Sequence, residues 1–166
     1  MQGLLARLLV MAIGGAILAC APAQDGGADL LRSFFRDLEA HRFDAAADLV
    51  READGAPLSA TTRDRFVRGW RKAYEGYDVR FTNVLVRRYP ESPAQQLPEE
   101  EIRRAGAVEG HAYAVKFEGS SNSPCVPVNS DVLPGTTQPI ALKRADATWF
   151  LLAGGIVGFV DTCPGA

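Results

Sequence analysis

Three cysteines and two histidines carry most of the reactive side-chain chemistry in this sequence of 166 residues. Thiolates act as nucleophiles and accept modifying groups, and imidazoles act as bases or metal ligands. These residues are Cys20, Cys125, Cys163, His41 and His111. The histidines lie far apart and no Cys or His pair has zinc-binding spacing, so the sequence predicts no metal site. No glycine-rich loop leads from a strand into a helix, so we also expect no nucleotide or other cofactor.

Cys20 stands at the boundary between an apolar run and a polar segment. The run 8–18 carries no charge, suits the hydrophobic region of a signal peptide and is too short to span a membrane as a helix. Its end, Ile17-Leu18-Ala19-Cys20, resembles the lipobox of bacterial lipoprotein signal peptides. The resemblance implies cleavage before Cys20 and acylation of that residue, with chains such as palmitate as the membrane anchor. Ordinary secretion, with a cleavage site at Ala19-Cys20-Ala21, is the alternative.

The lipobox resemblance implies a location in the bacterial cell envelope, with the chain held to a membrane by lipid on Cys20. Ala21 follows the cysteine in place of the Asp that is typical of inner-membrane retention. This favours the outer membrane, facing the periplasm, if the bacterium has two membranes. On this interpretation residues 1–19 are the signal peptide, residues 20–28 are the lipidated cysteine and a flexible tether, and residues 29–163 are one domain. The tether prediction depends on a proline and a glycine pair without apolar periodicity.

An odd number of cysteines in an exported chain needs an explanation. Lipid on Cys20 leaves Cys125 and Cys163, which are free to oxidise to a disulfide outside the cytosol. On the loop-entropy account such a bridge contributes about 3–4 kcal/mol to stability. The alternative is two unpaired thiols in a cytosolic protein.

The charge of the chain limits its partners. The formal net charge is -2, and loss of Arg7 with the signal peptide makes the mature chain more acidic still. Nucleic acid is usually met by a basic patch, and anionic lipid by a polybasic face, so neither is expected as a partner. The expected partners are the membrane, through lipid on Cys20, and an envelope protein or a small apolar ligand. A second copy of the chain, in a homodimer, is a further alternative.

Apolar stripes at helical spacing predict three helices before residue 77. The first is 29–40 with Asp29 as its N-cap, the second is 45–52 with Asp44 as its N-cap, and the third runs from Thr61 or Thr62 to Tyr74. The apolar residues of the third are Phe66, Val67, Trp70, Ala73 and Tyr74.

From residue 78 the apolar period changes from that of a helix to that of a strand. The predicted strands are 78–89, 108–118 and a hairpin of 140–143 with 148–153, continued by 156–160. A change of parity at Thr82-Asn83 predicts a β-bulge that bends the first strand. One short helix is predicted from Pro98 to Arg104, and a long loop at 119–138. The order predicts an α+β domain with three helices packed on one face of a curved antiparallel sheet of about four strands.

This order of elements resembles the nuclear transport factor two-like, or cystatin-like, superfamily. The resemblance is carried by Phe34-Phe35-x-x-Leu38 with His41-Arg42-Phe43-Asp44-Ala45-Ala46, by the helix 66–74, and by Thr148-Trp149-Phe150-Leu151-Leu152. It implies a cone-shaped domain whose helices and curved sheet enclose a pocket. Some members of the superfamily are isomerases, dehydratases or cyclases with an Asp or a His–Asp pair in the pocket. Others only bind a ligand or partner, or dimerise.

His111 is the leading catalytic candidate because it shares a strand face with Tyr113 and other apolar residues. Inside a pocket its imidazole could act as a general base. The alternative is a polar residue at the rim of the sheet, since only Glu109, on the same strand, could orient the ring. His41 is expected at a helix end, as a capping cation or exposed. The residues predicted as core or pocket lining are Trp70, Tyr74, His111, Tyr113 and Trp149.

We therefore expect a membrane-anchored envelope lipoprotein whose domain binds a ligand or a partner without catalysis. The alternative is an isomerase- or cyclase-type pocket enzyme that uses His111. A fold of this kind hosts both, so the fold alone does not decide between them.

Overall fold

The computed structural model describes residues 25–76, 78, 80–89, 97–120 and 139–155. The three cysteines lie outside these ranges, and so do the signal segment, most of the 119–138 loop and the strand predicted at 156–160. The lipidation of Cys20 and the pairing of Cys125 with Cys163 therefore stay predictions.

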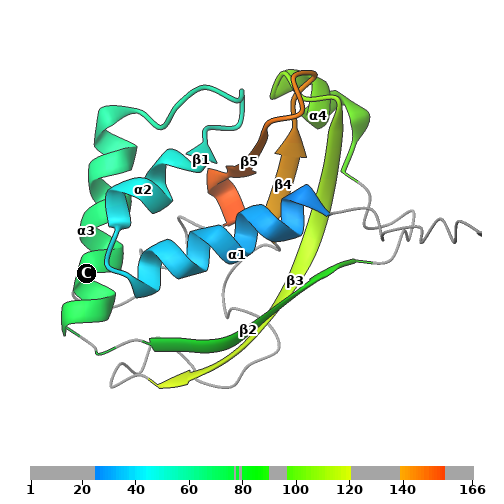
Figure 1. Cartoon of the computed structure of the whole chain (residues 1–166). Coiled ribbons are helices and arrows are strands. Elements are labelled where there is room, and N and C mark those ends of the chain that lie inside the picture. Colours follow the sequence, from blue (N-terminus) through cyan, green and yellow to red (C-terminus); the bar gives the residue numbers. More distant parts are fainter. Residues whose placement is uncertain (1–24, 77, 79, 90–96, 121–138, 156–166) are drawn as a thin grey trace, which may run out of the picture.

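The described residues form helices on both sides of one sheet (Figure 1). The helices are α1 (Gly26–Glu39), α2 (Phe43–Asp48), α3 (Ala60–Gly76) and α4 (Glu99–Arg104), with a 3₁₀ turn at Ala153–Gly155. The strands are β1 (Val50–Arg51), β2 (Arg80–Arg88), β3 (Glu109–Ser120), β4 (Ile140–Lys143) and β5 (Trp149–Leu152). Their order in the sheet is β1-β5-β4-β3-β2.

The predicted α+β class is confirmed, but the plan of three helices on about four antiparallel strands is not. The described residues hold four α-helices, of which α4 is the short helix predicted from Pro98, and five strands. The sheet is mixed and not wholly antiparallel, because β1 runs parallel to β5 with Val50 beside Leu151. The sequence places these residues at the end of a helix. The backbone hydrogen bond from Leu151 to the carbonyl of Leu49 (2.9 Å) shows that pairing with β5 overrides local helix propensity there.

The bulge in the first long strand and the C-terminal hairpin are confirmed. The register of β2 against β3 shifts between Thr82 and Leu85, and Asn83 has a left-handed φ of 50°. This irregularity bends the long ribbon of β2 and β3 that passes below α1 in Figure 1. Strands β3, β4 and β5 pair antiparallel in sequence order.

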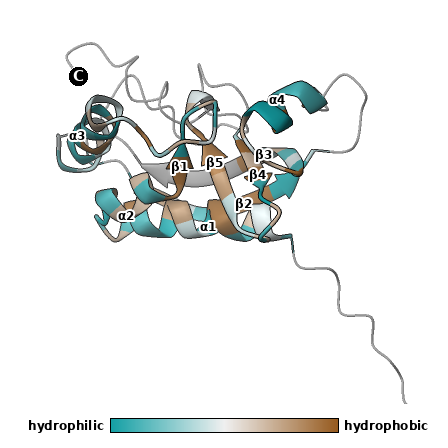
Figure 2. Ribbon diagram, turned by 90° about the horizontal axis from the view of Figure 1, so that it is seen from above, coloured by the Kyte–Doolittle hydropathy of each residue, from teal (hydrophilic) through white to brown (hydrophobic). Residues whose placement is uncertain are grey.

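Side chains of alternate parity build two separate cores on the two faces of the sheet. On one face Tyr113, Ala141 and Leu151 pack beneath α1. On the other, Leu142 and Phe150 pack with Ala105, Ala107 and the partly buried Leu97 and Ile102, which belong to α4 and its flanks. The expectation that helices cover only one face is therefore wrong for α4. Figure 2 shows α1 and α4 on opposite sides of the strands.

The larger core is rich in aromatic rings. Phe34 of α1 packs edge-on against Phe66 and Trp70 of α3, with ring centroids 6.1 and 6.2 Å apart. Trp70 and Tyr74 in turn contact Phe81 of β2 at 6.2 and 6.1 Å. These edge-to-face contacts join two helices to the bent strand. None of the described helices is long and apolar enough to cross a membrane.

Candidate functional site

The register of three strands brings charged and aromatic side chains into one row. Glu109 of β3 pairs with Lys143 of β4, and Lys143 pairs with Trp149 of β5. Two residues further along β3, His111 lies on the same face of the sheet. These four residues form what we call the β3–β5 cluster, beside the first turn of α1.

His111 and Glu109 form the hydrogen bond that would orient an imidazole. The distance between His111 Nε2 and Glu109 Oε1 is 2.6 Å, and Lys143 Nζ lies 3.2 Å from Glu109 Oε2. The hydrogen bond from His111, and then that from Lys143, hold the pKa of Glu109 below its ordinary value. The carboxylate is therefore ionised at neutral pH and accepts both bonds, so Nε2 of His111 carries a proton.

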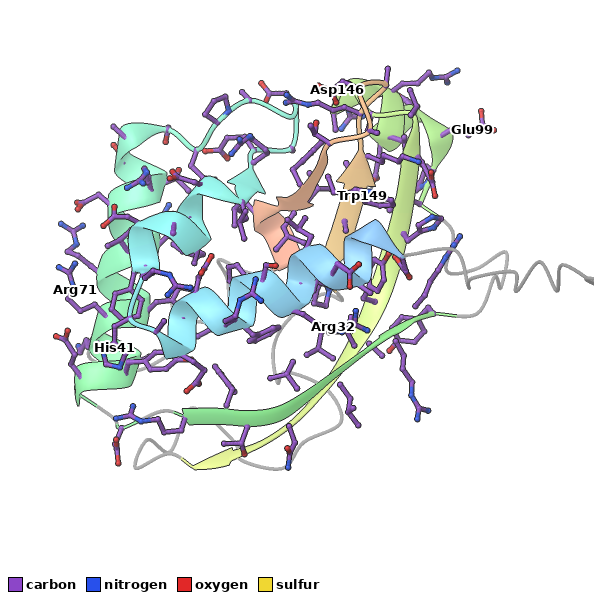
Figure 3. All side chains as sticks on the ribbon, viewed as in Figure 1. Arg32, His41, Arg71, Glu99, Asp146 and Trp149 are labelled. Atoms are coloured by element: carbon purple, nitrogen blue, oxygen red, sulfur yellow. The ribbon has the colours of Figure 1, made fainter. Side chains whose placement is uncertain are left out.

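Trp149 packs beside the imidazole of His111 and against the first turn of α1. Its ring centroid is 6.0 Å from that of His111, and Lys143 Nζ lies 5.7 Å from the indole centroid. The backbone of Gly26 packs directly on the indole, since a Cβ there would stand 2.3 Å from Trp149 Nε1. Figure 3 shows the labelled Trp149 next to the start of α1. The side chain of His111 is consequently only 14% exposed.

Asp25 joins the start of α1 to the sheet. Its carboxylate accepts from Ala28 N (3.1 Å), which makes it the N-cap, and from the hydroxyl of Tyr113 (2.6 Å). A Cβ on Gly27 would lie 2.2 Å from that hydroxyl, so only glycine permits this approach. Burial, and next the bond to Asp25, raise the pKa of Tyr113 above its ordinary value.

The helix therefore begins earlier than the sequence predicts. Asp29 was expected as the N-cap, with residues 20–28 as a flexible tether, but residues 26–28 are the first helical turn. The error has a physical cause: a glycine pair indicates flexibility in isolation, whereas here both glycines are needed for close packing on Trp149 and Tyr113.

Trp70 and Tyr74 lie apart from this cluster, in the aromatic core. Each side chain is 1% exposed. The hydroxyl of Tyr74 donates to Glu39 Oε1 (2.8 Å), which also accepts from the backbone N–H of Phe81 (2.5 Å). Burial, and then the bond to Glu39, raise the pKa of Tyr74 above its ordinary value. Of the residues predicted as core or lining, the structure thus groups His111, Tyr113 and Trp149 and separates Trp70 and Tyr74.

His41 terminates α1, as the sequence predicts, although the capping is done by the backbone. The N–H of His41 donates to Leu38 O (2.9 Å) and that of Arg42 to Asp37 O (2.8 Å), a Schellman motif. His41 has a φ of 57°, a conformation more often taken by glycine. Its exposed ring packs against Phe43 and Tyr74 at 5.6 and 5.5 Å.

Three residues that contact the predicted core or lining side chains were not singled out in the sequence: Asp25, Glu39 and Lys143. Asp25 could have been found as a second candidate N-cap three residues before Ala28. Lys143 could not have been found by aligning the predicted strands, because β3 ends at Ser120 and β4 begins only at Ile140, too far along the chain for a tight turn to fix their register. Glu39 offers no local signal, since its partners are 35 and 42 residues away.

The β3–β5 cluster can hold or transfer a proton at Nε2 of His111 and can present an indole and an ammonium group. No group of three His, Cys, Asp or Glu side chains among the described residues is arranged to hold a metal ion. No protein-family model matches the chain, and no curated protein is significantly similar to it.

Proposed function

We propose that this chain is a bacterial envelope lipoprotein, anchored by lipid on Cys20, whose α+β domain binds a protein partner. The observation that carries the proposal is Ile17-Leu18-Ala19-Cys20, followed only five residues later by the N-cap of the domain at Asp25. A lipid-anchored domain is expected to show this arrangement, in which an apolar run ends in a lipobox-like segment and the folded domain begins soon after it.

The packing of the domain supports binding over catalysis. Trp70, Tyr74 and Tyr113 are at most 1% exposed and contact other core side chains. The aromatic rings of this core contact one another and so fill the space between the helices and the sheet in which an enzyme of the nuclear transport factor two-like superfamily would hold its substrate.

The finer fold assignment is part of the proposal. Three helices ahead of a bent sheet, with β2 kinked at Asn83, agree with a nuclear transport factor two-like domain. The parallel β1 and the second core under α4 are additions to the simple plan inferred from the sequence. The outer membrane, facing the periplasm, is the location that we propose if the bacterium has two membranes.

Cys20→Ser is expected to abolish membrane attachment. Without the thiol no diacylglyceryl group can be added, and the chain loses the acyl chains that hold it to the bilayer. The measurement is membrane fractionation of the full-length chain, together with metabolic labelling by a fatty acid. Cys125→Ser is the matched control and should keep both signals. Membrane association of Cys20→Ser equal to that of the native chain would refute the anchor.

An isomerase- or cyclase-type enzyme is the second candidate function, favoured by one observation. The 2.6 Å hydrogen bond between His111 and Glu109 is the pairing that a general base of this kind requires. Against it, Lys143 also binds the carboxylate and Trp149 packs beside the imidazole.

Proton abstraction next to a carbonyl would give the enzyme a measurable activity. The full-length chain is incubated with a panel of apolar ketones in deuterated water, and NMR detects deuterium entering the α position. The enzyme hypothesis expects exchange that His111→Ala abolishes and His41→Ala retains. Exchange no faster than in buffer, or equal in both variants, removes this candidate.

A further inference from the structure

The distance between the lipid and the folded domain has a short upper limit that is set by the chain. Asp25 is five residues after Cys20. Because an extended chain advances about 3.3–3.6 Å per residue, the two Cα atoms are at most about 18 Å apart. A lipid on Cys20 enters the bilayer through a head-group region that is about 5–8 Å thick on each side. The start of α1 is therefore held close to the membrane surface.

The start of α1 cannot turn independently of the sheet. Asp25 is bonded to Ala28 N and to the Tyr113 hydroxyl, and Gly26 packs on Trp149. Attachment of the chain at Asp25 therefore restrains one defined face of the domain. We call it the anchor face, formed by Asp25, Asp29, Glu109, Lys143 and Trp149.

The carboxylates of the anchor face are all engaged by partners within the domain. Each of its carboxylates already has a cationic or hydrogen-bonding partner: Asp29 pairs with Arg32 at 2.7 Å, Glu109 with Lys143 and His111, and Asp25 with Tyr113. Lys143 and Trp149 are partly exposed, and Lys143 lies over the indole ring. An indole with a neighbouring ammonium group suits the head-group layer, where Trp and Lys are favoured.

We infer that the anchor face rests on the phospholipid head groups of the bilayer that holds the chain, with Trp149 and Lys143 at the contact. The inference rests on the proposed lipidation of Cys20. It places the far end of α1 and the outer side of α3, where Arg71 lies, away from the membrane; in Figure 3 Arg71 is at the outer edge of the domain beside α3, whereas Trp149 is near the start of α1. A partner would then approach from the α3 side.

The two tryptophans of the chain provide the test. The chain, expressed with its signal segment and purified from bacterial membranes, is reconstituted into phosphatidylethanolamine and phosphatidylcholine vesicles that carry a nitroxide on the head group. Trp70→Phe leaves Trp149 as the single emitter and should be quenched several-fold more than Trp149→Phe, whose emitter is buried. A third chain, with both tryptophans replaced by Phe and Arg71→Trp added, places an exposed emitter on the outer side of α3. It should be quenched as weakly as Trp149→Phe.

Mass spectrometry of each reconstituted chain separates the two proposals. Acyl chains on Cys20 with equal quenching of Trp149 and the residue 71 probe would overturn the orientation and leave the lipoprotein proposal intact. A Cys20 without acyl chains would overturn both. If Trp70→Phe fails to fold, the loss of quenching from the native chain to Trp149→Phe measures the same contact.

Discussion

Trp70→Ala is expected to lower the free energy of unfolding by about 3–5 kcal/mol, the range for truncation of a large buried aromatic side chain. The indole is 1% exposed and contacts Phe34, Phe66 and Phe81. Its removal would leave a cavity where α1, α3 and β2 meet, and the surrounding rings cannot collapse into it without breaking their own edge contacts. Urea denaturation of the mature domain, followed by circular dichroism, measures the loss.

Trp149→Ala is the matched comparison, because it removes the same side chain from a partly exposed position. We expect Trp149→Ala to lower the free energy of unfolding by clearly less than Trp70→Ala does. A loss of less than about 1 kcal/mol for Trp70→Ala, far below the value for a packed core, would contradict the close packing of Trp70.

The domain is expected to lose about 3 kcal/mol of stability between pH 8 and pH 11 through two tyrosines. Burial holds the pKa values of Tyr74 and Tyr113 above the ordinary value of 10.0. In the unfolded chain both ionise near that value, so above pH 10 the unfolded state binds fewer protons than the folded state. The stabilising effect is complete below pH 10 and is lost as the pH rises toward the folded values, at about 1.4 kcal/mol per pH unit for each tyrosine.

Tyr74→Phe and Tyr113→Phe separate the two contributions. Each variant is less stable at neutral pH, because Glu39 or Asp25 loses a hydrogen bond. Each should also show about half the alkaline loss of the native domain, and the double variant should show little of it. Urea midpoints measured from pH 8 to pH 11 test this. A pH dependence of the urea midpoint that is unchanged in the double variant would show that other groups cause the loss of stability at alkaline pH.

Elements with a local physical cause could be predicted from the sequence. The apolar spacing of Leu31, Phe34 and Leu38 defines the buried side of α1 whatever it packs against. The parity change at Asn83 likewise predicts the bulge, because a strand with one buried face must insert a residue when its pattern shifts. The short α4 could be located from Pro98, but not the second core that it covers.

What could not be predicted depends on partners far away in the chain. Val50 and Arg51 form a strand only because β5 supplies backbone partners about 100 residues later in the chain, in a pairing satisfied by main-chain hydrogen bonds. The contact of Lys143 with Glu109 likewise depends on the register of β4 against β3, which brings together two residues 34 positions apart. Neither contact can be recognised from the types of the residues that flank it in the sequence.

The sequence by itself determined the class of the fold, the apolar stripes, the bulge and the lipobox-like segment at Ile17-Leu18-Ala19-Cys20, since each is encoded by residue types at short spacing. Only the tertiary structure decided where the domain begins and which side chains of the sheet lie against its first turn. Asp25, Gly26 and Gly27 look like a flexible tether until Tyr113 and Trp149 are placed beneath them. Those contacts span more than 80 residues and arise from packing, which short-range patterns do not encode.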